Sequence, residues 1–293
     1  MKIDAHHHLW DLQAVSYPWL MDKGTKRFFG DPAPIRRDYL LAEFSGDASS
    51  TGVGASVHIQ VGAADSWAEA QWVQAVADKN QEWPLVQVAF CDLTKPDFAE
   101  RLERYKTLST VRGVRQIVGR APGEDAHTGT NALLDDPAFR AGLRRLPEFG
   151  LSYDLQLLPE LMKKTARVLE KCPETKVALC HAGSPHDRSP AGIAAWKNEL
   201  RHLSALSNVT CKLSGLGMFD HHWTAQSIKP IVEICLEQFG PDRCMFGSNF
   251  PVDSLYSDYA KLMTAYETLI PEQDKPAVFF ETARQFYVMD VAA

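Results

Sequence analysis

The chain lacks any run approaching the roughly 20 apolar residues that a membrane-spanning helix needs. Its first residues also lack the apolar core and the cleavage site of a signal peptide. Basic residues are in the minority, with 31 against 37 acidic ones and a net charge of −6. Neither a membrane nor nucleic acid is therefore expected as a partner. We expect a cytoplasmic protein, and the sequence leaves a homo-oligomer open.

Paired cysteines are absent as well. The six cysteines are scattered, and none of them forms a Cys-x-x-Cys motif, which disfavours a structural zinc site made of thiolates. Most of them lie in apolar runs, such as the one that ends at Cys180. We therefore expect buried free thiols in a reducing compartment and no disulfide framework.

Short apolar and β-branched runs recur about every 25 to 35 residues, as in chains where strands alternate with helices. Eight strands are expected, at residues 3–8, 55–61, 85–90, 111–118, 151–157, 176–181, 209–214 and 244–248. Segments with helical periodicity or helix-start residues lie between them, at 67–80, 97–105, 137–149, 159–170, 191–206, 228–239 and 258–269, and a further helix is expected at 275–288. Asp136 is the expected N-cap of the helix that begins at Pro137.

This alternation favours parallel strands joined by helical crossovers. Eight units in a chain of 293 residues are typical of a (β/α)₈ TIM-type barrel, and we expect one such domain over residues 1–293. The alternative is an open doubly wound sheet, which usually has a glycine-rich phosphate loop after its first strand. Three histidines stand there instead, which favours the barrel and places the active site at the carboxyl ends of the strands.

The first strand ends in His6-His7-His8. Side chains alternate along a strand, so His6 and His8 point to one side and His7 to the other. Two imidazoles so placed can bind one metal ion or one substrate oxygen. The alternatives are solvated histidines on a terminal strand or the remnant of a purification tag, although a tag would not stand between Ile-Asp-Ala and Leu-Trp.

Polar residues stand at most of the other expected strand ends. A barrel packed for stability alone would end its strands in apolar or small residues, so the pattern predicts a functional rim. The residues are His58, Gln60, Arg115, Asp154, Gln156, His181, Lys212, Ser214 and Asn249. For Gln60, Asp154 and Gln156 the alternative is that they only satisfy backbone groups. For Lys212 the alternative is that it extends to solvent.

The segment from Leu9 to Ile35 is rich in aromatic residues, proline and glycine and has no helical or strand period. Long loops of this kind often form a binding rim or a lid. We expect Trp10 and Trp19 to wall a pocket. The alternative is a loop that packs its aromatic rings on its own barrel.

The chain resembles the amidohydrolase superfamily and, within it, the lactonase-type group called amidohydrolase 2. The resemblance extends over nearly the whole chain and rests on several motifs that occur in the order of the group. They are Asp-Ala-His-His-His-Leu-Trp-Asp at 4–11, Tyr-Pro-Trp-Leu at 17–20, Val-Arg-Gly-Val-Arg-Gln at 111–116, Leu-Ser-Tyr-Asp-Leu-Gln at 151–156, His-Ala-Gly-Ser-Pro at 181–185, Lys-Leu-Ser-Gly-Leu at 212–216 and Met-Phe-Gly-Ser-Asn-Phe-Pro-Val at 245–252.

The resemblance implies a hydrolase that opens a small lactone from sugar-acid or aromatic-acid catabolism. It makes His6 and His8 the His-x-His pair, His181 the histidine of strand six, and Arg115 the arginine that binds the substrate carbonyl or anion. The three histidines would hold one zinc or manganese ion with water as a fourth ligand. The alternative is a metal-independent enzyme, in which His6, His8 and Arg115 donate hydrogen bonds to the developing oxyanion.

Asn249 departs from the group, which usually has aspartate at this position. An amide cannot accept a proton near neutral pH, so the role of base passes to His181 or to Asp253, four residues further on. We expect His181, Asn249 and Asp253 to be catalytic. Substrate binding is assigned to Arg115, Lys212, Trp10, Trp19, Gln60, Asp154 and Gln156.

Two other functions remain open from the sequence. A non-oxidative decarboxylase of a small aromatic acid uses the same barrel, but it normally needs the aspartate that Asn249 replaces. A binding protein that has lost catalysis would explain Asn249. It would not explain why His6, His8 and His181 are all present.

Overall fold

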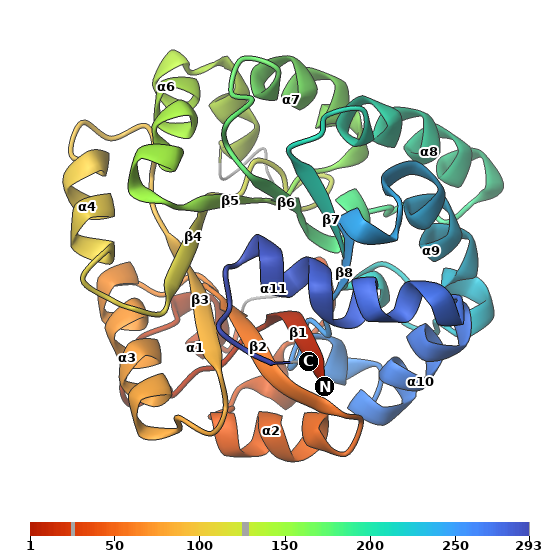
Figure 1. Cartoon of the computed structure of the whole chain (residues 1–293), viewed down its shortest axis with the longest axis horizontal. Helices are drawn as coiled ribbons and strands as arrows, with labels where there is room; N and C mark the ends of the chain where they lie inside the picture. The colour runs from red at the N-terminus through yellow and green to blue at the C-terminus, as the bar shows by residue number, and fades with distance from the viewer. Residues whose placement is uncertain (25–26, 125–128, 293) are drawn as a thin grey trace.

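The computed structural model describes residues 1–24, 27–124 and 129–292, and in this part of the chain eight parallel strands form a barrel sheet (Figure 1). The strands follow one another around the sheet in chain order: β1 (Lys2–His7), β2 (Val53–Ile59), β3 (Leu85–Phe90), β4 (Val111–Arg115), β5 (Ser152–Leu155), β6 (Val177–Leu179), β7 (Val209–Leu213) and β8 (Cys244–Phe246). The end of β1 and the segment after β8 close the circle. The Asn249 amide donates to the His6 carbonyl and the His8 amide donates to the Phe250 carbonyl, both at 2.7 Å. The expected (β/α)₈ barrel is confirmed.

Helices surround the strands, with bounds close to those expected from the sequence. They are α1 (Pro18–Met21), α2 (Leu41–Ser49), α3 (Ser66–Lys79), α4 (Phe98–Tyr105), α6 (Pro137–Arg145), α7 (Met162–Leu169), α8 (Pro190–Ser204), α9 (Ala225–Phe239), α10 (Tyr259–Leu269) and α11 (Thr282–Phe286). Asp136 caps α6 as expected, because its carboxylate accepts from the amide of Ala138.

Several expected boundaries were wrong. Helix α2 was not expected, because its nine residues include Gly46 and three small polar residues and so show a weak apolar period. Most strands end earlier than expected, so residues such as Gln60 and His181 belong to the segments that follow. The segment from Leu9 to Ile35 contains the short helix α1 and a 3₁₀ turn at its end, and residues 25–26 lie outside the described part. The expected helix 275–288 is a π-helical turn (Ala277–Glu281) followed by α11.

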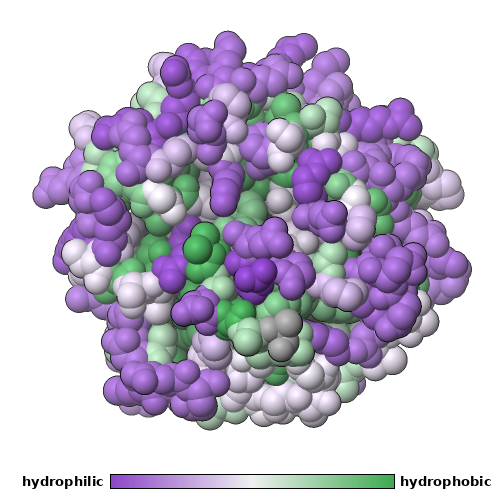
Figure 2. Space-filling view, viewed as in Figure 1, coloured by the Kyte–Doolittle hydropathy of each residue, from purple (hydrophilic) through white to green (hydrophobic). Residues whose placement is uncertain are grey.

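The barrel interior is apolar at the end where both termini lie. Residues from β1, β2 and β3 meet there with the C-terminal segment in one buried cluster, which includes Ile3, Val57, Val88, Phe280 and Tyr287. Figure 1 shows α11 lying across this end of the barrel. The same face is mainly hydrophilic outside, with apolar residues in small patches (Figure 2). In the described part of the chain, these apolar side chains therefore close this end of the barrel.

A register shift in β1 sets the direction of its histidines. The pairing with β2 shifts between Asp4 and His7, at the point where one Asp4 oxygen accepts from the amide of His6 at 3.0 Å. Ile3 therefore packs in the barrel interior, while the His7 ring stacks on Phe44 of α2 outside the barrel, 3.9 Å between ring centroids. The shift lets His6 face the interior although Ile3 faces it too.

The cysteines are buried, as expected from the apolar runs in which most of them lie. All six are free and buried. Within the described residues, no helix combines the length and the apolar character needed to cross a membrane.

Candidate active site

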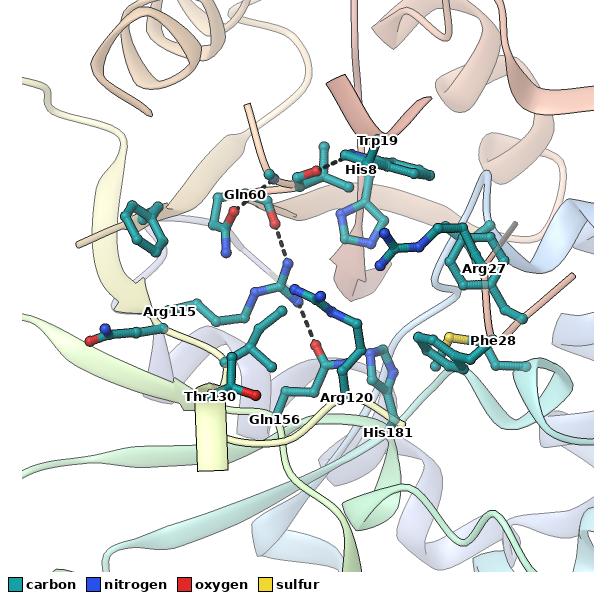
Figure 3. Close-up of a pocket in the computed structure, with 18 of the residues that line it drawn as sticks. His8, Trp19, Arg27, Phe28, Gln60, Arg115, Arg120, Thr130, Gln156 and His181 are labelled. Carbon is teal, nitrogen blue, oxygen red and sulfur yellow. Dashed lines mark hydrogen bonds between the residues drawn. The ribbon is translucent and has the colours of Figure 1, made fainter. Parts of the chain in front are cut away.

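A pocket of about 540 Å³ lies where the strands of the barrel end (Figure 3). Phe90 and Arg115 are the last residues of β3 and β4, and most of the other lining residues come from segments that follow a strand. Of the residues expected at the site, His8, Trp19, Gln60, Arg115, Gln156, His181 and Asn249 line it. Trp10, Asp154, Lys212, Asp253 and His6 do not; His6 lies just behind the wall, against His8 and His181.

Three histidine rings meet behind and at the pocket wall. The ring centroid of His6 lies 5.2 Å from that of His8 and 4.5 Å from that of His181. The Nδ1 atom of His8 lies 2.7 Å from the carbonyl of Ile59, so this nitrogen carries the proton, and His181 Nδ1 lies 3.0 Å from the hydroxyl of Ser214. His6 is fully buried, yet neither of its ring nitrogens has a hydrogen-bond partner among the described residues.

Burial keeps these imidazoles neutral. Removal from water lowers the pKa of His6 and His8 well below the usual range. Burial, and then the positive charges of Arg115 and Lys212, lowers the pKa of His181 to about 3. At neutral pH each ring therefore keeps a nitrogen lone pair, which is what proton acceptance or metal binding requires.

Unusual backbone conformations aim the site residues. His181 has a φ of 55° and Asn249 a φ of 58°, in the left-handed region that side chains rarely adopt. Gly215 has a φ of +63°, and a Cβ atom there would lie 2.4 Å from His181 Nδ1. The indole of Trp196 holds the turn after β6 by donating to the carbonyl of Ala182 at 2.8 Å.

Asn249 links His8 to Asp253. Its Oδ1 atom lies 3.3 Å from His8 Nε2, and its Nδ2 atom donates to Asp253 Oδ1 at 2.9 Å. His8 carries its proton on Nδ1, so its Nε2 atom has a free lone pair. This lone pair faces a lone pair of the Asn249 amide oxygen, and a proton or a cation between the two atoms would satisfy both. Burial raises the pKa of Asp253 to about 7. Asp253 stands behind Asn249, so its carboxyl reaches the pocket only through the amide.

Lys212 and Asp154 form a buried ion pair beneath the pocket. Both side chains have no exposed surface, and Lys212 Nζ lies 2.5 Å from Asp154 Oδ2. The hydroxyl of Tyr287 donates to the same carboxylate, with contacts of 2.8 and 3.1 Å. The alternative that Lys212 extends to solvent is therefore wrong. Neither member of the pair lines the pocket, so their position does not support the expected role in substrate binding.

Arg115 reaches the pocket floor from the end of β4. Its guanidinium donates to Gln156 Oε1 at 3.3 Å and to the backbone carbonyl of Gln60, while its Nε atom is buried without a partner among the described residues. Within that part of the chain no carboxylate lies within 4.0 Å of it. The site thus holds a buried cation whose protein partners are neutral.

The two tryptophans expected at the rim have different positions. Trp19 lines the pocket, and its indole donates to the carbonyl of Val61 at 2.6 Å. Trp10 is fully buried away from the pocket, and its indole donates to the carbonyl of Arg37. Trp19 therefore lies in the pocket wall as expected, whereas Trp10 packs its ring on the barrel, as in the alternative.

The sequence predicts that His58 and Gln60 share the inward face of β2, and the structure differs. Val57 and Ile59 point into the barrel, and His58 points outward, where its Nε2 atom lies 3.7 Å from Glu69. Gln60 reaches the pocket only because the chain leaves the strand after Ile59. Both faces of a parallel barrel strand are buried, so the sequence does not show which residues face inward.

The whole chain is similar to known proteins. Residues 3–288 match the family model described as amidohydrolase. The chain belongs to the amidohydrolase family. It is 35% identical to the protein y4mH of Sinorhizobium fredii over 97% of both chains, and 27% identical to an L-fucono-1,5-lactonase of Burkholderia multivorans over 99% of this chain and 96% of that one. An amidohydrolase of Burkholderia multivorans, solved with bound zinc, has the same fold, with a TM-score of 0.82 and 25% identity over 99% of both chains.

Two groups of side chains could be considered as ligands of a divalent cation in this amidohydrolase, and only one of them suits an ion. His6, Asp154 and Cys180 bring ligand atoms within 4.8 Å of one another. However, the ammonium of Lys212 already neutralises Asp154, and burial raises the pKa of Cys180 to about 12, which keeps the thiol protonated. His6 and His8 suit an ion better, because their rings are neutral and His6 has unpartnered nitrogens.

Sequence reasoning missed two arginines of the pocket wall. Arg27 and Arg120 belong to loops, and both line the cavity with Glu124 close by. A weak signal was present, because each lies within a long segment that follows an expected strand. The sequence does not show how such loops fold back over a barrel.

Proposed function

We propose that this amidohydrolase opens a small lactone by attack of water on the ring carbonyl. The observation that supports this most is the convergence of the cationic Arg115 and the neutral rings of His8 and His181 on one pocket at the carboxyl ends of the strands. Ester hydrolysis needs these two elements, a positive group for the developing oxyanion and a proton acceptor for water.

Arg115 stabilises the oxyanion in this proposal. It is fixed by Gln156 and the carbonyl of Gln60, so it needs no rearrangement when negative charge develops. Its charge is worth most in a pocket with few competing carboxylates, because a low-dielectric site strengthens each electrostatic contact.

His181 accepts the proton of the attacking water in this proposal. Ser214 holds its Nδ1 atom, so Nε2 is the atom available to the pocket. Its pKa of about 3 reflects burial next to positive charge. When the carbonyl oxygen becomes negative beside Arg115, it offsets the positive charge that disfavours a protonated ring, so the basicity of the His181 ring rises. The ring is therefore a weak base before the reaction and a stronger one during it.

Asn249 and Asp253 position His8 in this proposal. The amide bridges the His8 ring and the buried carboxyl, so substitution of Asp253 acts on the pocket through Asn249. His6 and His8, with the Asn249 oxygen beside them, would hold a divalent ion, and such an ion would polarise the carbonyl and lower the pKa of bound water.

Proton release from a panel of sugar and muconic lactones tests the proposal. The wild type should release protons with at least one of them, and His181→Ala should lower the rate by about 100-fold or more, the usual contribution of a positioned base. His202→Ala, on the outer helix α8, is the matched control and should leave the rate unchanged.

Two outcomes would contradict lactone hydrolysis. Release of CO₂ from an aromatic acid without turnover of any lactone would identify a decarboxylase. Tight binding of a lactone with no turnover, in metal-free and in zinc-loaded protein, would identify a binding protein.

A further inference from the structure

The three residues 59–61, at the end of β2, hold three side chains of the pocket wall by their backbone carbonyls. In chain order, these carbonyls accept from His8 Nδ1 at 2.7 Å, from the guanidinium of Arg115 and from the indole of Trp19 at 2.6 Å. Figure 3 shows the three side chains around the pocket. A side chain is held only as firmly as the group it is bonded to, so a shift of this short segment would move all three.

Glu69 of α3 fixes the segment from outside the barrel. Its Oε1 atom accepts from the amide of Val61 at 3.0 Å, and its side chain is only 3% exposed. The layer between a barrel strand and the helix that covers it is normally apolar, and a glutamate is rarely buried without a partner. Among the described residues, no lysine or arginine nitrogen lies within 4.0 Å of this carboxylate. An ion pair that serves stability alone therefore does not explain its position.

His58 fixes the segment after β1 and faces Glu69. Its Nδ1 atom accepts from the amide of Leu9 at 3.1 Å, so Nδ1 carries no proton and Nε2 carries one. The Nε2 atom lies 3.7 Å from Glu69 Oε1, and the side chain of His58 is only 1% exposed. One buried pair thus contacts both the backbone next to His8 and the segment 59–61.

We propose that Glu69 and His58 are positioning residues, which fix the wall of the active site from outside the barrel. Neither side chain is among the described residues that line the pocket, so both act through the backbone after β1 and β2. The effect on the reaction rests on the proposed function, whereas the effect on the position of the wall does not depend on turnover. A displacement of about 1 Å in a catalytic group can lower a rate by about 100-fold.

Glu69→Gln and Glu69→Met test the proposal as a matched pair. Both remove the charge and nearly keep the length of the side chain, but only the amide of glutamine offers an oxygen to Val61. On a lactone that the wild type opens, Glu69→Met should lower kcat by about ten-fold or more, and Glu69→Gln should stay within about three-fold of the wild type. Val73→Ala, at a buried position of the same helix, is the control for a destabilised α3 and should keep the wild-type kcat.

The indole signal of Trp19 gives a second measurement, which needs no turnover. In protein with nitrogen-15 tryptophan, the signal is assigned by its absence in Trp19→Phe. It should shift in Glu69→Met and stay in place in Glu69→Gln, because the indole donates to the carbonyl of Val61. If Glu69→Met does not fold, Glu69→Ala removes the same acceptor with less bulk and takes its place in both measurements.

His58→Leu and His58→Asn repeat the comparison at the other segment. The amide oxygen of asparagine can replace Nδ1 as the acceptor for the amide of Leu9, and leucine offers no acceptor. The leucine variant should therefore lose about ten-fold or more in kcat, and the asparagine variant should keep most of the wild-type rate.

Three results would decide against the positioning role or against the reaction. Equal kcat in Glu69→Gln and Glu69→Met would overturn the role, because it would show that the acceptor for the backbone amide does not matter. An equal loss in Glu69→Met and Val73→Ala would overturn it too, because a weakened helix would then explain the loss. A Trp19 signal that shifts as expected, in a protein that opens no lactone, would support the positioning role and contradict the proposed function alone.

Discussion

At the scale of the residue, the site is governed by buried polar and ionisable groups that have neutral partners or none among the described residues. Arg115 has neutral hydrogen-bond acceptors, His6 has none among the described residues, and Asp253 has the amide of Asn249. Unpaired buried groups destabilise a fold, so their concentration around one pocket is a functional feature.

The Asp253 carboxyl predicts a dependence of stability on pH. Its folded pKa of about 7 lies above the unfolded value of 3.8, so the folded protein binds this proton more tightly. Stability should therefore fall as the pH rises from about 4 to 7 and stay level above 7. Asp253→Asn keeps an acceptor for Asn249 and removes the titration. In urea unfolding between pH 5 and 8, the free energy of unfolding of the variant should rise relative to that of the wild type up to pH 7. A difference that stays constant with pH would contradict the prediction.

The buried pair of Lys212 and Asp154 predicts a loss of stability on removal of one partner. Lys212→Met should lower the free energy of unfolding by about 3–5 kcal/mol, because it leaves a buried carboxylate without its cation. The double variant Lys212→Met with Asp154→Asn should recover a large part of this loss. Denaturant unfolding measures both, and a double variant as unstable as the single one would show that the cost is not electrostatic.

At the scale of the element, the short strands and the loops after them decide which residues meet. Several residues that were expected at strand ends lie in the following turns. The left-handed backbone at His181 and Asn249 directs these two side chains to the pocket. The glycine after Ser214 matters for the same reason, since its missing side chain leaves space for the His181 ring.

Gly215→Ala should impair catalysis more than stability. The added methyl would lie 2.4 Å from His181 Nδ1, and a displacement of about 1 Å in a catalytic group can lower the rate by about 100-fold. Gly150→Ala is the matched control, because it has a similar φ of +69° with nothing within 4 Å. Both variants carry the backbone strain, so only the crowding differs. Equal kcat/KM in the two variants would contradict the role given to His181.

Some of these elements could be predicted from the sequence, and others could not. The expected strand 85–90 has the observed bounds of β3, because only Gln87 interrupts its apolar run, Pro84 directly precedes it and Asp92 follows closely. Helix α2 was missed, because nine residues with Gly46 give too weak a period. The arginines of the wall were missed, because their position depends on contacts between loops that are far apart in the chain.

At the scale of the whole molecule, the two ends of the barrel have separate roles. The end that holds the termini is sealed by apolar residues of the C-terminal segment, and the opposite end carries the pocket. Motifs scattered from residue 4 to residue 252 therefore meet at one rim, which is why their order along the chain was informative although each motif is short.

Phe280→Ala should separate these two roles. Phe280 is buried against the barrel interior, and its truncation should lower the free energy of unfolding by about 3–5 kcal/mol through lost burial and a cavity. The pocket lies at the other end, so kcat/KM measured well below the melting temperature should stay near the wild-type value. A large loss of kcat/KM at a temperature where the variant is fully folded would contradict this separation.

The position of the incoming oxygen atom tests the central claim most directly. A lactone that the enzyme opens is incubated in water labelled with oxygen-18, and the product is analysed by mass spectrometry. Attack of water at the carbonyl, beside Arg115 and His181, predicts one labelled atom in the new carboxyl group and none in the new hydroxyl group. A label in the hydroxyl group, or no enzyme-dependent ring opening, would contradict the proposal.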